Sequence, residues 1–166
     1  MFSFPDPVNE VSARLVAAGV VLMCVATLAL GEPWIIAVIA YGFVARVLTG
    51  PTLSPLGQLV TRVLTPALPF PANDTPGPPK RFAQGIGATL SVGALVAWLG
   101  FGNLTLAYVL VFMISVAATL ESVFGYCLGC RIFGMLMRAG VIPESACAEC
   151  NDIWSRLPEP TEASAR

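Results

Sequence analysis

The sequence predicts an all-α integral membrane protein: a four-helix bundle of two helical hairpins, a short cytosolic amphipathic helix, and a small cysteine-bearing C-terminal helical cap. Three observations lead to this fold class. Only 11% of the 166 residues are charged and 56% are apolar, whereas roughly 25% of a soluble domain is charged. The mean hydropathy is +0.78. Four long apolar segments and a one-sided distribution of basic residues complete the pattern, so we expect lipid to surround most of the chain.

The four apolar segments each approach the roughly 20 residues that a helix needs to cross a bilayer. We expect spans at about 13–31, 33–48, 82–100 and 104–124, the second being the shortest. Gly31-Glu32-Pro33 joins the first two spans, and Phe101-Gly102-Asn103 joins the last two. Such short connections force antiparallel hairpins, and the sequence thus predicts a transmembrane domain over residues 1–126.

The basic residues all fall on one side of these predicted spans. Neither short loop contains Lys or Arg, and the positive-inside rule then predicts a protein of the cytoplasmic (inner) membrane with both termini in the cytosol. The nine basic residues are Arg14, Arg46, Arg62, Lys80, Arg81, Arg131, Arg138, Arg156 and Arg166. A cleaved signal peptide at the first span is the alternative, but Asp6 and Glu10 stand where that alternative needs a basic segment.

The segment 50–81 is expected to form a cytosolic, proline-rich loop, because eight prolines interrupt any long helix. Apolar residues still recur at helical spacing within it, at Leu56, Leu59, Val60, Val63 and Leu64. This spacing predicts a short amphipathic helix at the inner membrane surface. Its apolar face either packs against the bundle or docks a partner, and we favour packing.

Two Cys-x-x-Cys pairs, Cys127/Cys130 and Cys147/Cys150, lie in a predicted cytosolic cap over residues 127–157, before a disordered tail at 158–166. Each pair has the spacing of a dithiol that cycles with a disulfide or relays sulfur. The four thiolates together also suit tetrahedral zinc, and less well an iron–sulfur cluster. The cytosol keeps thiols reduced, so we expect no permanent disulfide.

Composition excludes other chemistries. The chain has no histidine, which removes imidazole ligands and histidine-based catalysis. Its net charge is -1, so no basic surface is available for nucleic acid. Cys24 lies mid-span, and we interpret it as an apolar packing residue.

Local electrostatics decide which thiol reacts. Arg131 is adjacent to Cys130 and is expected to favour the Cys130 thiolate. A new helix starting near Cys127 would stabilise a thiolate through its N-terminal dipole, whereas an unbroken fourth span would oppose it. Gly125 and Gly129 make a break plausible.

Glu121 falls in the inner third of the fourth span, where an ionisable group is a functional candidate. It could exchange protons with a thiol. The alternative is a carboxyl near the inner surface that Ser122 or water satisfies.

Three segments resemble a known family: Ser54-Pro55-Leu56, the Pro78-Pro79-Lys80-Arg81-Phe82-Ala83-Gln84 entry to the third span, and Phe124-Gly125-Tyr126-Cys127-Leu128-Gly129-Cys130. Over about residues 8 to 139 the chain resembles the bacterial four-helix membrane family catalogued as domain of unknown function 4395. The resemblance implies association with thioredoxin-like or rhodanese-like sulfurtransferase proteins. The second cysteine pair lies beyond the usual family core. Glu121 departs from the family too, because a small or amide residue is expected at that position.

These observations favour thiol–disulfide redox or sulfur relay by Cys127 and Cys130 with a soluble thioredoxin-like or rhodanese-like partner, with Cys147 and Cys150 as a second, resolving pair and Glu121 as the proton-transfer candidate. The alternative is a non-enzymatic subunit of a larger membrane complex whose four cysteines bind a structural zinc. A transporter for a thiophilic ion is disfavoured, since most of each span lacks polar residues.

Overall fold

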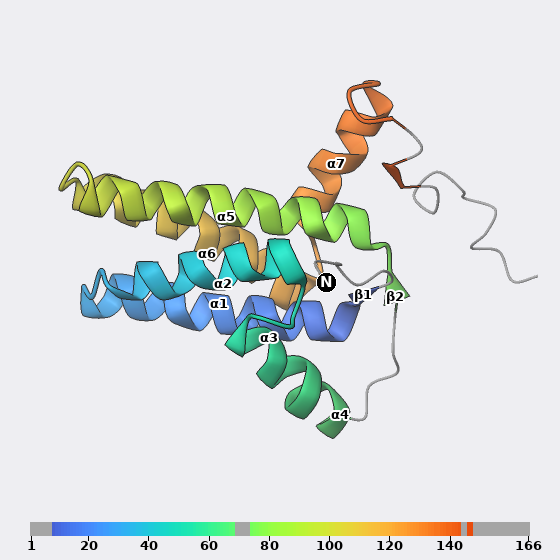
Figure 1. Cartoon of the computed structure of the whole chain (residues 1–166), viewed down its shortest axis with the longest axis horizontal. Coiled ribbons are helices and arrows are strands. Elements are labelled where there is room, and N and C mark those ends of the chain that lie inside the picture. Colours follow the sequence, from blue (N-terminus) through green and yellow to red (C-terminus); the bar gives the residue numbers. More distant parts are fainter. Residues whose placement is uncertain (1–7, 69–73, 144–145, 148–166) are drawn as a thin grey trace, which may run out of the picture.

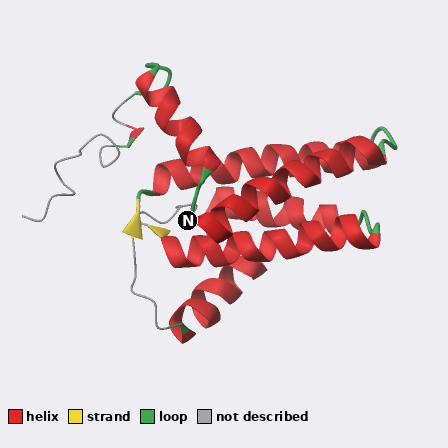
Figure 2. Cartoon of the chain, turned by 180° about the vertical axis from the view of Figure 1, so that it is seen from behind, coloured by secondary structure: helices red, strands yellow, loops and turns green. Residues whose placement is uncertain are grey.

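The computed structural model describes residues 8–68, 74–143 and 146–147, and its architecture is all-helical apart from one two-stranded ladder. Four long helices lie side by side: α1 (Glu10–Leu30), α2 (Ile35–Thr49), α5 (Gly77–Leu99) and α6 (Leu104–Phe124) (Figures 1 and 2). The main contacts join α1 to α6, α2 to α5, and α5 to α6. Within the described residues, α1, α5 and α6 are each long and apolar enough to span a membrane, and α2 is a shorter apolar helix.

Local sequence signals set the ends of these helices. The Asn9 side chain accepts hydrogen bonds from the backbone N–H groups of Val11 and Ser12 and so caps α1. Asn103 caps α6 in the same way. Gly31 ends α1 at a φ of 69°, a left-handed conformation that glycine adopts without strain. The two short connections lie at the same end of the molecule, where the Tyr108 hydroxyl donates to the Gly31 carbonyl at 3.1 Å.

The core lies between the four long helices and consists of aliphatic side chains and alanines. Ile36, Cys24 and Val111 are fully buried, so Cys24 is an internal packing residue as expected. Gly87 of α5 lies against the ring of Phe43, where a Cβ atom would overlap the ring. A small residue at this position therefore lets α2 and α5 approach closely.

The expected bounds of the third span are wrong at its start. Helix α5 begins at Gly77 and not near residue 82, so Lys80 lies in a helix that was expected to be loop. Pro78 and Pro79 occupy the first turn of α5. Backbone N–H groups in a first turn have no intrahelical partner, so proline costs the helix no hydrogen bond there. By contrast, α6 covers the same residues, 104–124, as the apolar segment predicted there.

The segment after α2 forms a short, nearly continuous run of helix that starts beside α1 and then diverges from the bundle (Figure 1). It consists of α3 (Pro55–Leu59), a single π-helical turn η1 (Val60–Leu64) and α4 (Thr65–Ala67). Val60 is fully buried, and the Leu56 side chain fills the space over Gly19 of α1. Leu59 and Val63 are about half exposed on the opposite face. One apolar face therefore packs against α1, as the favoured interpretation expected.

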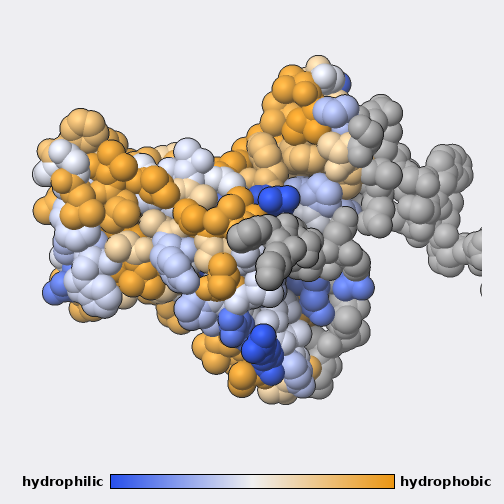
Figure 3. Space-filling view, viewed as in Figure 1, coloured by the Kyte–Doolittle hydropathy of each residue, from blue (hydrophilic) through white to orange (hydrophobic). Residues whose placement is uncertain are grey.

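The remaining elements gather at the end opposite the short connections. Strands β1 (Val8–Asn9) and β2 (Asp74–Thr75) pair antiparallel. Helix α7 (Leu128–Arg138) then leaves the bundle at a steep angle to α5 (Figure 1). Figure 3 shows apolar surface along the helices, with the most hydrophilic atoms mainly toward the end of the strands. The expected tail 158–166 and most of the expected cap beyond residue 143 lie outside the described residues.

Candidate functional site

The first cysteine pair lies at a break between two helices. Gly125 ends α6 at a φ of 65°, and Cys127 is the N-cap of α7. The Cys127 sulfur accepts a hydrogen bond from the backbone N–H of Cys130 at 3.4 Å. A new helix therefore starts at the pair, which is the arrangement whose dipole stabilises a thiolate at Cys127.

The glycine between the two cysteines fixes where α7 meets α5. A Cβ atom at Gly129 would lie 2.5 Å from both the Cα and the Cβ atoms of Ala83. The Phe133 ring of α7 also packs edge-on against Phe82 of α5, with centroids 5.6 Å apart. These two contacts hold the pair against the inner end of α5.

The two thiols are unequal. The Cys130 thiol donates a hydrogen bond to the Cys127 sulfur, at a sulfur–sulfur distance of 2.7 Å, and both are free thiols. This hydrogen bond holds the pKa of Cys127 below its ordinary value, although burial and Glu121 oppose the shift. The same hydrogen bond, together with burial, raises the pKa of Cys130. Cys127 is therefore the thiol of the pair that ionises first.

The expectation that Arg131 favours a thiolate at Cys130 is wrong. The Arg131 guanidinium lies over the ring of Tyr126, 5.1 Å from its centroid. Adjacency in the sequence does not place a charge beside a neighbour's sulfur when the two side chains leave the helix in different directions.

Glu121 has a partner that the sequence analysis did not consider. Its Oε1 atom accepts from the Lys80 ammonium at 2.7 Å, and the two side chains are 17% and 10% exposed. Ser122, which was considered, donates instead to the carbonyl of Thr119. Lys80 was missed because it was assigned to a loop. The consecutive prolines just before it are typical of a first helical turn, and this signal could have placed Lys80 in a helix.

Arg46 is a second buried cation at this end, and it too was missed as a site residue. It is 5% exposed, and its Nε donates to the Gln84 side-chain oxygen at 3.0 Å. Its Nη1 donates to the Ser54 hydroxyl at 3.2 Å. Both partners are neutral. Arg46, Gln84, Lys80 and Glu121 thus form a buried polar cluster next to the cysteine pair, under an otherwise apolar bundle.

Two hollows meet at Cys127. One is a cavity of about 260 Å³ inside the bundle, which we call the inner cavity, with Cys127, Arg46 and Glu121 in its wall. The other is a groove of about 330 Å³ between α5, α7 and the β1–β2 end, which we call the outer groove. Cys127 lines both hollows, whereas Cys130 lines only the outer groove.

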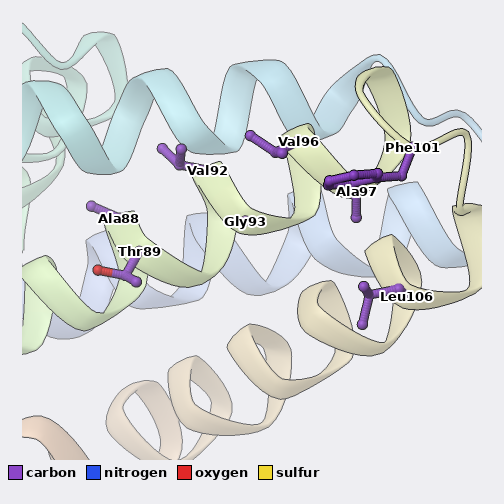
Figure 4. Close-up of a pocket in the computed structure, with 8 residues that line it drawn as sticks. All are labelled: Ala88, Thr89, Val92, Gly93, Val96, Ala97, Phe101 and Leu106. Carbon is purple, nitrogen blue, oxygen red and sulfur yellow. The ribbon is translucent and has the colours of Figure 1, made fainter.

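A larger hollow of about 590 Å³ lies at the opposite end of α5 (Figure 4). Its wall is formed by α5, α6 and their connection, and includes Val92, Val96 and Phe101. The side chains drawn there are almost all carbon, with a single hydroxyl at Thr89 (Figure 4). Because it contains no ionisable or nucleophilic group, we interpret it as part of the apolar outer surface.

The second cysteine pair is described only in part. Cys147 is buried and disulfide-bonded, which contradicts the expectation that the chain holds no disulfide, and Cys150 lies outside the described residues. Within the described ranges, no three or more Cys, Asp or Glu side chains are grouped so that they could hold a metal ion. The structure thus brings Cys127 and Cys130 together with Glu121 nearby, and the zinc alternative stays an untested prediction.

Comparison with known proteins gave one match. The family model described as domain of unknown function (DUF4395) matches residues 8–138. This range contains the four long helices, the Lys80–Glu121 pair and the Cys127/Cys130 dithiol. No curated protein and no solved structure matches the chain.

Proposed function

Because the chain belongs to the DUF4395 family, whose description assigns no activity, we propose its function from the site itself. We infer that the protein crosses the cytoplasmic membrane four times, with both termini in the cytosol. Its Cys127/Cys130 dithiol exchanges with the disulfide, or accepts the sulfane sulfur, of a soluble thioredoxin-like or rhodanese-like protein.

The proposed topology is supported by where the charges lie. Both short connections are at one end of the helices, and neither contains a basic residue. Among described residues, the basic side chains belong to the opposite end: the first turns of α1 and α5, the last turn of α2, the η1 turn, and α7. The positive-inside rule assigns that opposite end to the cytosol. Helix α2 has 15 residues, about 22 Å of helix, so residues flanking it complete its crossing.

The proposed chemistry is supported by one observation. The two thiols line the outer groove, and their pKa values are shifted in opposite directions. A thiolate is the species that attacks disulfides and sulfane sulfur, and a thiol of low pKa is also the better leaving group. Cys127 combines both properties with a neighbouring thiol close enough to form the disulfide. The buried Lys80–Glu121 pair next to it supplies opposite charges that tune the thiolate.

The test is a thiol-exchange assay with purified protein in lipid nanodiscs. Reduced protein is mixed with an oxidised thioredoxin-like protein, and the free thiols of both are counted with time. We expect two thiols to be lost from the membrane protein for each partner disulfide reduced. Neither Cys127→Ser nor Cys130→Ser should reduce the partner fully, because a single thiol can form only a mixed disulfide. Cys24→Ser is the matched control and should exchange normally, because Cys24 lies in the core.

Metal analysis of the same preparation separates the zinc alternative. Stoichiometric zinc together with thiols that do not react would overturn the redox proposal. A metal-free protein whose dithiol titrates reversibly would support it.

The role proposed for Cys147 and Cys150 is that of a second pair that re-reduces or re-oxidises the first. The double variant Cys147→Ser/Cys150→Ser is expected to keep the first exchange event and to lose repeated turnover. Unchanged turnover would remove this pair from the mechanism.

A further inference from the structure

The inner cavity has an amphiphilic wall. Helices α1, α2, α5 and α6 form its length, and the start of α7 closes one end. Along most of its length the side chains are apolar, among them Val20, Phe43 and Leu90. Its polar side chains gather at the α7 end, where Arg46, Gln84, Glu121 and Cys127 line it. A ligand that matches this wall has an apolar body and hydrogen-bond acceptors close to the Cys127 sulfur.

The apolar rim shows from which phase such a ligand arrives. Three lining residues are substantially exposed: Met113 at 51%, and Leu128 and Ile132 at 38% each. They belong to α6 and to the face of α7 that turns toward the bundle. Met113 lies midway along α6, and an exposed apolar side chain at that point of a membrane-spanning helix faces lipid and not water. The inner cavity is therefore reached from the bilayer, whereas the outer groove is reached from the aqueous side.

We propose that the inner cavity binds the ring of a lipid-soluble quinone, which takes two electrons and two protons from the Cys127/Cys130 dithiol. This inference rests on the thiol–disulfide function proposed above and names the second reactant of the same site. The cavity volume of about 260 Å³ is below the roughly 300–1,000 Å³ of sites for drug-sized ligands. It accommodates one substituted ring, with the isoprenoid tail in the lipid.

The buried polar cluster provides the recognition. Quinone carbonyl oxygens accept hydrogen bonds, and the Arg46 guanidinium and the Gln84 amide are donors in the same wall. Arg46 is nine-tenths buried or more and its two hydrogen-bond partners are neutral. Glu121 lines the same cavity but forms its ion pair with Lys80, so the Arg46 guanidinium can stabilise negative charge that develops on a quinone oxygen during reduction.

Two electrons and two protons pass from the dithiol to the quinone in two steps. The Cys127 thiolate adds to a ring carbon, and the electron pair displaced onto the carbonyl oxygen takes up the proton that Cys127 released on ionising. The Cys130 sulfur then loses its proton and attacks the Cys127 sulfur, so the sulfur–sulfur bond forms and the sulfur–carbon bond breaks. The ring keeps that electron pair, takes the second proton, and leaves as hydroquinone. Glu121 lines the cavity beside Cys127 and passes this proton.

The two hollows give the two sulfurs different roles. Cys130 lines only the outer groove, so a reduced soluble partner attacks the Cys130 sulfur of the oxidised pair. Cys127 is then released as a thiolate that faces the inner cavity, where the quinone is bound. Electrons thus pass from a soluble dithiol to the lipid phase through one cysteine pair.

The experiment adds a short-chain ubiquinone analogue to reduced protein in nanodiscs and follows the loss of quinone ultraviolet absorbance together with the loss of free thiols. We expect one quinone reduced per protein, with a disulfide between Cys127 and Cys130 by peptide mapping. Ala117→Phe fills the inner cavity and should slow quinone reduction about tenfold or more. Met113→Trp, at the exposed rim, should slow it without entering the core.

The matched control is Thr89→Phe, which introduces the same phenyl ring into the hollow at the other end of α5 (Figure 4) and should leave the rate unchanged. Each variant is also tested for exchange with a soluble aromatic disulfide, which reports the fold and the dithiol. Wild-type protein that exchanges with the soluble disulfide but does not reduce the quinone would overturn this inference and leave the proposed function standing. Protein that reacts with neither would overturn the proposed function. Equal slowing by Ala117→Phe and Thr89→Phe would show that the quinone does not enter the inner cavity.

Discussion

At the scale of single residues, the Cys127/Cys130 pair derives its asymmetry from one hydrogen bond. The Cys130 thiol donates to the Cys127 sulfur, which favours the thiolate at Cys127 and disfavours it at Cys130. A hydrogen bond to a charged group contributes about 1.5–3 kcal/mol, and one pKa unit corresponds to about 1.4 kcal/mol. The bond is thus strong enough to set the order in which the thiols ionise.

Removal of this hydrogen bond should slow the reaction of Cys127. A lowered pKa means more thiolate at neutral pH and faster alkylation, so in Cys130→Ala the alkylation profile of Cys127 should move to higher pH. The measurement is the rate of iodoacetamide modification of the Cys127 peptide against pH, by mass spectrometry. In Cys127→Ala the Cys130 profile should move the opposite way, to lower pH. Coincident profiles in all proteins would contradict the assignment.

The Lys80–Glu121 pair permits a test with opposite outcomes. Lys80 lowers and Glu121 raises the pKa of Cys127. At neutral pH, Lys80→Met should therefore slow alkylation of Cys127 severalfold, and Glu121→Gln should accelerate it. A change in the same direction in both variants would indicate loss of local structure and not electrostatics, and thermal unfolding of each variant checks this.

At the scale of elements, the position of α7 depends on one close approach. Gly129 lies against Ala83 of α5, whereas a Cβ atom at Gly134, on the same helix, would meet open space. Helix α7 is otherwise attached through the Phe82–Phe133 contact. A clash with backbone atoms cannot be relieved by turning a side chain, so α7 itself must shift.

We expect Gly129→Ala to undock α7 at a loss of about 1–3 kcal/mol of local stability. Gly134→Ala, the matched control, should leave docking intact and make α7 a better helix, because Ala exceeds Gly in helix propensity by about 1 kcal/mol. Amide hydrogen exchange of residues 128–138 is the measurement. Faster exchange in both variants, or in neither, would contradict the close approach as the cause of docking.

At the scale of the whole molecule, the proposed topology separates the two ends of the bundle by a membrane. A single cysteine introduced as Glu32→Cys into a protein without its native cysteines should react with a membrane-impermeant maleimide added to intact cells. Cysteines restored at Cys127 and Cys130 should react only after the cells are opened. Labelling of Cys127 from outside would falsify the cytosolic location of the dithiol.

The proposed topology also accounts for the position of the site at one end of the bundle. In the proposed topology lipid surrounds the length of the helices, which explains why the buried charges gather at one end. There α5 and α6 supply Lys80 and Glu121, and α2 supplies Arg46. Each of these long side chains reaches its partner close to the aqueous boundary. The dithiol stands at that boundary, with one hollow opening toward lipid and one toward water.

The sequence alone determined the features that depend on composition and on nearest neighbours. These are the all-helical class, the apolar helices and their short connections, and the family. Hydropathy and turn chemistry are local, so a single chain displays them directly. The error at the start of α5 is of the same local kind, because Pro78 and Pro79 suit a first helical turn as well as a loop.

Only the tertiary structure decided which residues meet. Lys80 and Glu121 are 41 positions apart, and Arg46 and Gln84 are 38 apart, and no periodicity indicates such pairs. The structure also decided that the pKa of Cys127 is lowered and that of Cys130 raised, and that the Arg131 side chain lies over Tyr126. Side-chain direction and packing between helices set these contacts, and both arise only when the helices are in place.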